Sequence, residues 1–154
     1  MSLFANSVTQ FFIAAAATIC FGILFSVPKR HFWACGLTGA VGWLVYLLSS
    51  AAGLSPAMAT FAAALPLTLL ARTFSVRNRA PVTLFLLCGI FPLVPGAGIY
   101  YTAYYFLQND RLLFVNKGVE TFKIAIAIAL GIALISSLPF PTRRGATARK
   151  GKTQ

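Results

Sequence analysis

Two prolines and two glycines fall within seven residues of an otherwise apolar stretch that runs from Phe91 to Gly98. A proline lacks an amide donor and disfavours helix at the residue before it, so this composition predicts a break within a helix. Beyond Pro95 the amides of Gly96, Ala97 and Gly98 would begin a new helical segment and face the gap. Because a helix N-terminus carries about half a positive charge, such amides suit an anion. The chemistry predicted for this stretch is the binding of a carboxylate.

Hydroxyl groups follow the break closely and would add polar contacts to a bound solute. A pair of tyrosines and a threonine come next in the chain, whereas Tyr104 and Tyr105 fit an aromatic belt at a membrane surface. The alternative is a structural kink whose free backbone groups are satisfied by neighbouring helices. The predicted substrate-binding residues are Pro92, Pro95, Gly96, Ala97, Gly98, Tyr100, Tyr101 and Thr102.

Charged side chains are few, and only two of them are acidic. Glu120 and Lys123 lie one helical turn apart, which favours an ion pair near the start of a helix and leaves a role in gating open. The two carboxylates, on Asp110 and Glu120, do not form a buried pair. The cysteines and the histidine lack metal-ligand spacing, and the phosphate-binding loop motif is missing. We therefore expect no enzymatic activity, no metal and no cofactor.

The composition places these residues in a membrane protein. Hydrophobic residues make up 58% of the 154 residues and charged residues 10%, against about 25% charged in soluble domains. The net charge of +11 is distributed in short runs between apolar stretches. That pattern is typical of cytoplasmic loops and not of a face that binds nucleic acid. Each apolar stretch should be helical, because backbone groups in lipid must hydrogen-bond within their own segment.

Five apolar stretches are long enough to cross a bilayer, which takes about 20 helical residues. The chain is therefore predicted to be an all-α integral membrane protein whose fourth span is broken at a Pro-x-x-Pro-Gly element. Ser55 is expected to cap the third span, with Pro56 as its first residue. The segment from Pro81 to Phe91 would cover about 16 Å of helix, which puts the break near the bilayer midplane. The spans are predicted at Leu3–Val27, Phe32–Ala52, Pro56–Phe74, Pro81–Leu107 and Val119–Leu138.

Basic residues mark one side of the membrane. They follow the first, third and fifth spans, whereas the other side has an uncharged N-terminus, an uncharged turn and a nearly balanced loop. The positive-inside rule then places the N-terminus outside and the C-terminus in the cytoplasm. We divide the chain into a transmembrane domain, residues 1–140, and a basic, disordered cytoplasmic tail, residues 141–154.

Small residues at four-residue spacing indicate where helices approach closely in lipid. Glycine and alanine are also common in membrane helices without such a role. The three cysteines lie inside apolar spans and are expected to behave as small buried residues. The small-residue pairs are Cys35/Gly39, Gly36/Ala40 and Ala127/Gly131.

Several of these stretches resemble the threonine/serine exporter family, specifically its small stand-alone members, which are equivalent to the C-terminal half of the long members. The resemblance covers nearly the whole chain outside the tail, and the Pro-Leu-Val-Pro-Gly-Ala-Gly core is its specific part. The matching stretches are Val27–Arg30, Gly39–Trp43, Ala59–Phe61, Phe91–Tyr101, Lys117–Thr121 and Ala129–Gly131.

The resemblance implies secondary export of small polar metabolites across the bacterial inner membrane. Threonine and serine are the namesake solutes of the family, and dicarboxylates such as succinate remain open for the short branch. Since this chain lacks the N-terminal half of the long members, the resemblance also implies a second membrane subunit that supplies it. Two further readings remain: a non-transporting assembly or regulatory subunit, and a channel-like homo-oligomer built around the break.

Overall fold

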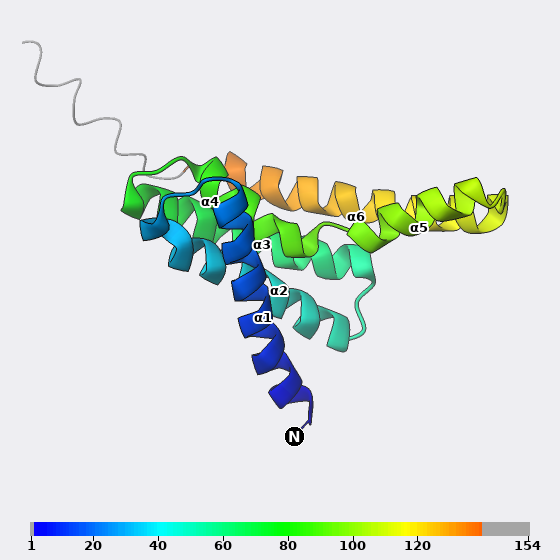
Figure 1. Cartoon of the computed structure of the whole chain (residues 1–154), viewed down its shortest axis with the longest axis horizontal. Helices are drawn as coiled ribbons and strands as arrows, with labels where there is room; N and C mark the ends of the chain where they lie inside the picture. The colour runs from blue at the N-terminus through cyan, green and yellow to red at the C-terminus, as the bar shows by residue number, and fades with distance from the viewer. Residues whose placement is uncertain (1, 140–154) are drawn as a thin grey trace, which may run out of the picture.

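The computed structural model describes residues 2–139, with side chains from residue 8 onward, and every regular element in this part of the chain is helical (Figure 1). The predicted tail, residues 141–154, lies outside the described residues. The helices are α1 (Ser2–Leu24), η1 (Lys29–His31), α2 (Phe32–Ala51), α3 (Pro56–Asn78), α4 (Val82–Ile90), η2 (Phe91–Leu93), α5 (Gly96–Leu107) and α6 (Arg111–Ser137).

Helix lengths and composition confirm an all-α membrane protein. Three segments are long and apolar enough to cross a bilayer unbroken: Lys29–Ala51, Pro56–Asn78 and Arg111–Ser137. The pair Val82–Leu93 and Gly96–Leu107 qualifies as a fourth span when it is taken together, with a bend of 55°. The fifth helical segment is α1, and within the residues whose side chains the structure describes its apolar stretch is Val8–Leu24.

The N-terminus of α3 forms as predicted. Ser55 precedes the helix, and its hydroxyl oxygen accepts a hydrogen bond from the Met58 amide at 3.4 Å. Pro56 is the first helical residue, where its missing amide donor is not needed. The helix runs past the predicted end at Phe74 and stops at Asn78, because Arg79 takes up a left-handed conformation with φ of 52°.

The last helix begins earlier than predicted. We expected a start near Val119, but α6 begins at Arg111 and is 27 residues long. Its N-terminus is fixed by Asp110, whose carboxylate accepts a hydrogen bond from the Leu113 amide at 3.1 Å. The prediction followed the hydropathy boundary, whereas the actual start follows this side-chain cap, so polar residues expected in a loop belong to the helix.

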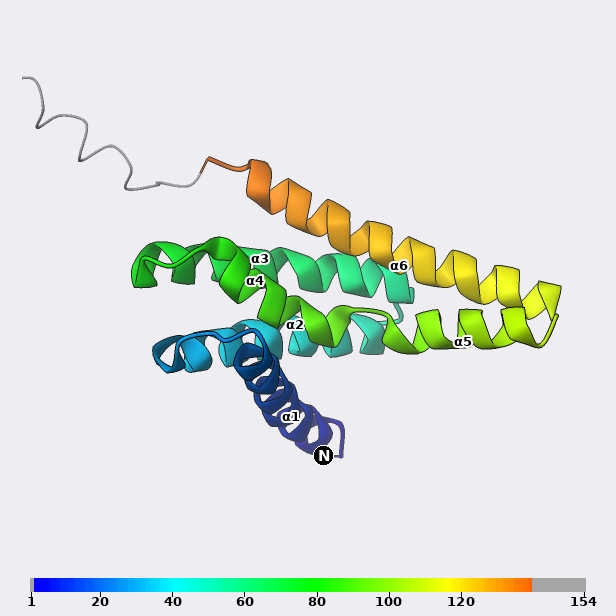
Figure 2. The same cartoon turned by 45° about the horizontal axis from the view of Figure 1, so that its top comes forward.

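Helices α3 and α6 run in the same direction, side by side (Figures 1 and 2). A Cβ atom added to Gly131 of α6 would lie 2.6 Å from the Cβ of Ala64 on α3. Further along both helices, the Arg72 guanidinium of α3 donates hydrogen bonds to the carbonyls of Ile135 and Leu138, the latter at 2.9 Å. Because α3 and α6 cross the membrane in the same direction, the chain has to cross back once between the end of α3 and the start of α6. The bent pair α4–α5 is therefore one broken span.

Glycines and threonines allow the close packing of the four helices in the body of the protein. Gly39 of α2 faces Thr18 of α1, and Gly89 of α4 faces Thr38 of α2. Both threonine hydroxyls are buried and donate to the carbonyl four residues earlier, at 2.7 Å, so neither is left unsatisfied. All three predicted small-residue pairs include a glycine that lies against another helix, which confirms them as packing positions.

The prediction for the cysteines holds at two of three positions. Cys35 and Cys88 are fully buried in a core between α2, α3 and α4. Cys20 is exposed on α1 instead. Its apolar surroundings in the sequence could not distinguish a position that faces the core from one that faces outward.

Candidate transport site at the broken helix

One of the two prolines causes the break. Val94, immediately before Pro95, is extended, with φ of −61° and ψ of 128°. Phe91, immediately before Pro92, keeps helical angles of −53° and −41°, and Pro92 is accommodated within the short helix η2. The predicted break is confirmed and follows from the steric effect of Pro95 on Val94, whereas Pro92 is accommodated within η2.

The break lies level with the middle of the bundle. Leu93 is buried in a core cluster with Ala63 and Leu67 of α3 and Ile128 of α6. Since α3 spans Pro56–Asn78, Leu67 marks its centre. On the other side, Phe91 stacks on Phe21 of α1 with ring centroids 4.2 Å apart. The chain before the break is thus anchored to the body of the protein.

The amides after the break are only partly available. The Gly96 amide donates to the Val94 carbonyl at 2.7 Å, closing a tight turn centred on Pro95. The prediction of an open amide at Gly96 is therefore wrong. The amides of Ala97 and Gly98 have no acceptor among the described residues, because the extended Val94 has moved the preceding carbonyls out of line. Two donors, instead of three, face the gap at the start of α5.

Beyond the break, α5 leaves the body of the protein and packs against α6 (Figure 2). A side chain at Gly98 would collide with the Thr121 hydroxyl, and a Cβ on Gly118 would lie 3.4 Å from the Thr102 methyl group. Glycine and threonine thus alternate across the contact. No residue of α5 is buried, so one long face of this helix is uncovered.

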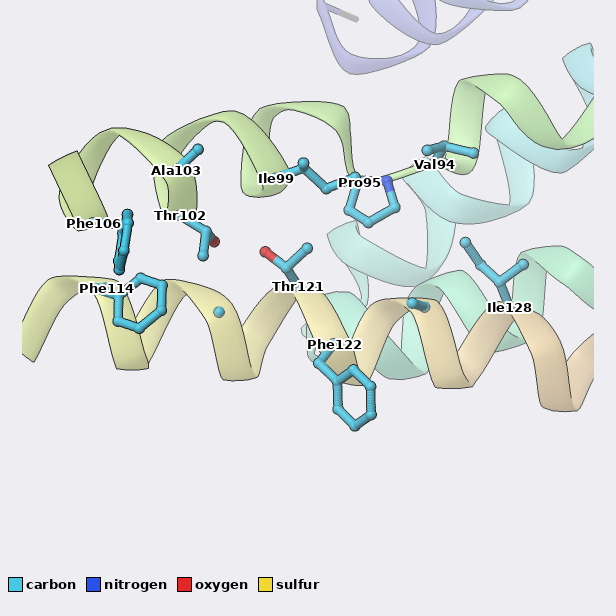
Figure 3. A pocket seen from close by; sticks show the side chains of 12 residues that line it. Val94, Pro95, Ile99, Thr102, Ala103, Phe106, Phe114, Thr121, Phe122 and Ile128 are labelled. Atoms are coloured by element: carbon cyan, nitrogen blue, oxygen red, sulfur yellow. The ribbon is translucent and has the colours of Figure 1, made fainter. Parts of the chain in front are cut away.

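An apolar groove of about 630 Å³ lies between α5 and α6 (Figure 3). The hydroxyls of Thr102 and Thr121 lie in it, but each donates to a carbonyl of its own helix, Gly98 and Lys117 respectively, at 2.7 Å. Of the predicted binding residues, only Pro95 and Thr102 line the groove. The lining residues are Val94, Pro95, Ile99, Thr102, Ala103, Phe106, Phe114, Gly118, Thr121, Phe122, Ala125 and Ile128.

The tyrosines form a separate aromatic surface on α5. Tyr100 stacks on Tyr104, and Tyr101 on Tyr105, each pair with ring centroids 6.3 Å apart. Tyr100 is 63% exposed and Tyr101 47%, and neither lines the groove. The predicted hydroxyl contacts from these two residues would therefore form outside the groove.

Glu120 forms an ion pair, but not with the predicted partner. Its carboxylate accepts from the Lys117 ammonium at 2.9 Å, so the expected pair with Lys123 is wrong. Glu120 and Lys123 instead line a second hollow of about 390 Å³, which we call the polar pocket. Its other lining residues are Ser55, Pro56, Ala57, Asn116 and Val119. Sequence reasoning missed this pocket, because it brings together residues of α3 and α6 that are about sixty positions apart.

Comparison with known proteins agrees with this architecture. The family model described as threonine/serine exporter, ThrE, matches residues 10–138. A protein of Mycobacterium tuberculosis named probable threonine/serine exporter is 31% identical over 134 residues. That match covers 86% of this chain but 25% of the relative, so the chain spans about a quarter of the length of this relative. No solved structure matches. The chain is a multi-pass membrane protein and belongs to the threonine/serine exporter family.

Proposed function

We propose that this chain is one half of a secondary exporter that carries small polar metabolites across the bacterial inner membrane, with threonine- and serine-type amino acids as its solutes. The observation that carries the proposal is the broken helix. Its break lies level with the centre of the bundle, and the helix after it has no buried residue. Transporters place their solute sites at such interrupted helices, near the membrane midplane.

The solute would enter the gap at the start of α5. The amides of Ala97 and Gly98 offer donors to its carboxylate, and the α5 dipole adds about half a positive charge. Thr102 and Pro95 shape the adjacent groove. The amide of Gly96 has no part in this site, because it is engaged by the Val94 carbonyl.

A second membrane subunit would complete the site. The exposed face of α5, with its stacked tyrosines, needs a covering surface if a polar solute is to be held there. Of the two acidic residues of the chain, Asp110 caps α6 and Glu120 is ion-paired with Lys117. A proton-coupled carrier usually needs a titratable group within the membrane, so the coupling residue would belong to the partner.

Flux measurements in liposomes test this function. We expect saturable exchange of radiolabelled L-threonine when the chain is reconstituted with its second subunit, and none with either protein alone. Succinate, supplied as the competing solute, should inhibit weakly. A flux that rises linearly with gradient would identify a channel, and absence of flux from the complex would identify an assembly or regulatory subunit. Proton-coupled exchange by this chain alone would contradict the role of the partner.

We also expect the N-terminus outside and the C-terminus in the cytoplasm. In a background without native cysteines, Leu54→Cys should react with an impermeant thiol reagent added to intact cells, whereas Arg77→Cys should react only after permeabilisation. Both side chains are exposed, at opposite ends of α3, so accessibility within the fold does not bias the comparison. The reverse pattern would invert the topology.

A further inference from the structure

The polar pocket lies at the start of α3, apart from the break. Its residues on α6 recur at helical spacing and face the first turn of α3, whereas Thr121 faces α5. Leu93, at the break, packs against Ala63 and Leu67, which are two to three turns further along α3 than Pro56. On α6 the two sites share one level, since Thr121, which contacts Gly98, lies between Glu120 and Lys123, and they are separated by the faces of the helix that line them. Because α3 and α6 run in the same direction, the polar pocket faces the side of the membrane on which both helices begin.

Glu120 and Lys123 both line this pocket but do not form an ion pair with each other. One oxygen of Glu120 accepts from Lys117, and the other has no hydrogen-bond partner among the described residues. Lys123 has no ion-pair partner in the described part of the chain. The side-chain amide of Asn116 lies at the same pocket and adds a donor and an acceptor. The pocket thus offers a free carboxylate oxygen and a free ammonium, one helical turn apart.

We propose that the polar pocket binds a free amino acid in its zwitterionic form, with the solute ammonium on Glu120 and the solute carboxylate on Lys123. The volume of about 390 Å³ falls in the range of small-molecule sites. This inference rests on the proposed function: the pocket is a second station for the exported solute, at the membrane surface.

An aminophospholipid headgroup presents the same chemistry, an ammonium beside an oxyanion. The polar pocket opens beside the first turn of α3, an end of a spanning helix where such headgroups are expected. Free amino acid and lipid are distinguished by the bilayer composition: the amino-acid site works in any lipid, whereas a headgroup site needs an aminophospholipid.

The experiment measures exchange of L-threonine by the complex in liposomes and its inhibition by two analogues. L-Threonine methyl ester lacks the carboxylate charge, and 2,3-dihydroxybutyrate lacks the ammonium. Lys123→Gln should raise the KM for threonine about fivefold, in line with a partly exposed charge pair. It should also narrow the advantage of threonine over the ester as a competitor, while the analogue without the ammonium stays weak. Glu120→Gln should give the opposite analogue pattern.

Arg111→Gln is the matched control, because it removes a cation from the same helix outside the polar pocket and should leave KM and analogue ranking unchanged. A misfolded variant loses exchange but does not acquire an altered analogue ranking. Wild-type exchange together with unchanged ranking in both pocket variants overturns this inference and leaves the proposed function standing. Variant effects that vanish in pure phosphatidylglycerol vesicles assign the pocket to a lipid and also overturn it. Absence of wild-type exchange refutes the proposed function, and the pocket inference falls with it.

Discussion

Replacing Pro95 with alanine should abolish most of the export while leaving the protein in the membrane at its normal level. The proline holds Val94 in an extended conformation and thereby starts a new helix at Gly96. A proline inside a helix costs about 3 kcal/mol, so its removal should shift the equilibrium about a hundredfold toward a straight helix. The gap, the two free amides and the 55° bend would all be lost. Threonine exchange in liposomes and the quantity of protein in membranes are the two measurements.

Pro92→Ala is the matched control for this experiment. Pro92 lies three residues away in the same segment, but Phe91 before it already has helical angles. We therefore expect Pro92→Ala to retain at least most of the exchange. Equal losses in both variants would show that export depends on a general rigidity of the segment and not on the break that Pro95 creates.

The second large effect is expected on stability, at the contact between α1 and α2. A Cβ on Gly39 would collide with the Thr18 hydroxyl and lie 2.9 Å from the Cβ and Cγ2 atoms of Thr18. Overpacking of this kind costs about 1–3 kcal/mol, so Gly39→Ala should lower the unfolding temperature in detergent, and Gly39→Leu should lower it further. Unfolding followed by circular dichroism measures both.

Two further variants make the stability prediction specific. A Cβ on Gly96 would have no atom within 4 Å, so Gly96→Ala should leave the unfolding temperature unchanged. The Gly39→Ala protein should regain stability when Thr18→Gly is added, because this change removes the atoms that collide. Failure of that rescue would mean that Gly39 is needed for its backbone and not for the closeness of the two helices.

The spans could be predicted from the sequence because their signals are local. Uncharged stretches define them, and Ser55 with Pro56 marks the start of α3 through contacts within one turn. The start of α6 is different: the hydropathy boundary lies near Val119, whereas the cap, Asp110, is equally local but lies earlier in the chain. Where the two signals disagree, the hydrogen bond of the cap determines the helix boundary.

The candidate site was predictable only in part. The presence of a break followed from composition, but the sequence could not show which proline causes it, since Pro92 and Pro95 carry the same intrinsic bias. The engagement of the Gly96 amide depends on the backbone angles at Pro95, and the partner of Glu120 on side-chain placement. The polar pocket depends on the packing of α3 against α6, for which the local sequence carries no signal.

The two helices of the hairpin, α5 and α6, are joined to the body of the protein in different ways. The α5 arm joins the body through the extended residue Val94, whereas α6 continues unbroken into its contacts with α3. A change of backbone angle at Val94 cannot rotate the whole hairpin while α6 keeps its contacts with α3. It has to appear as shear, with α5 sliding along α6. At the contact of Gly98 with Thr121 the backbone of α5 lies against a small side chain, so no bulky side chain opposes such a movement.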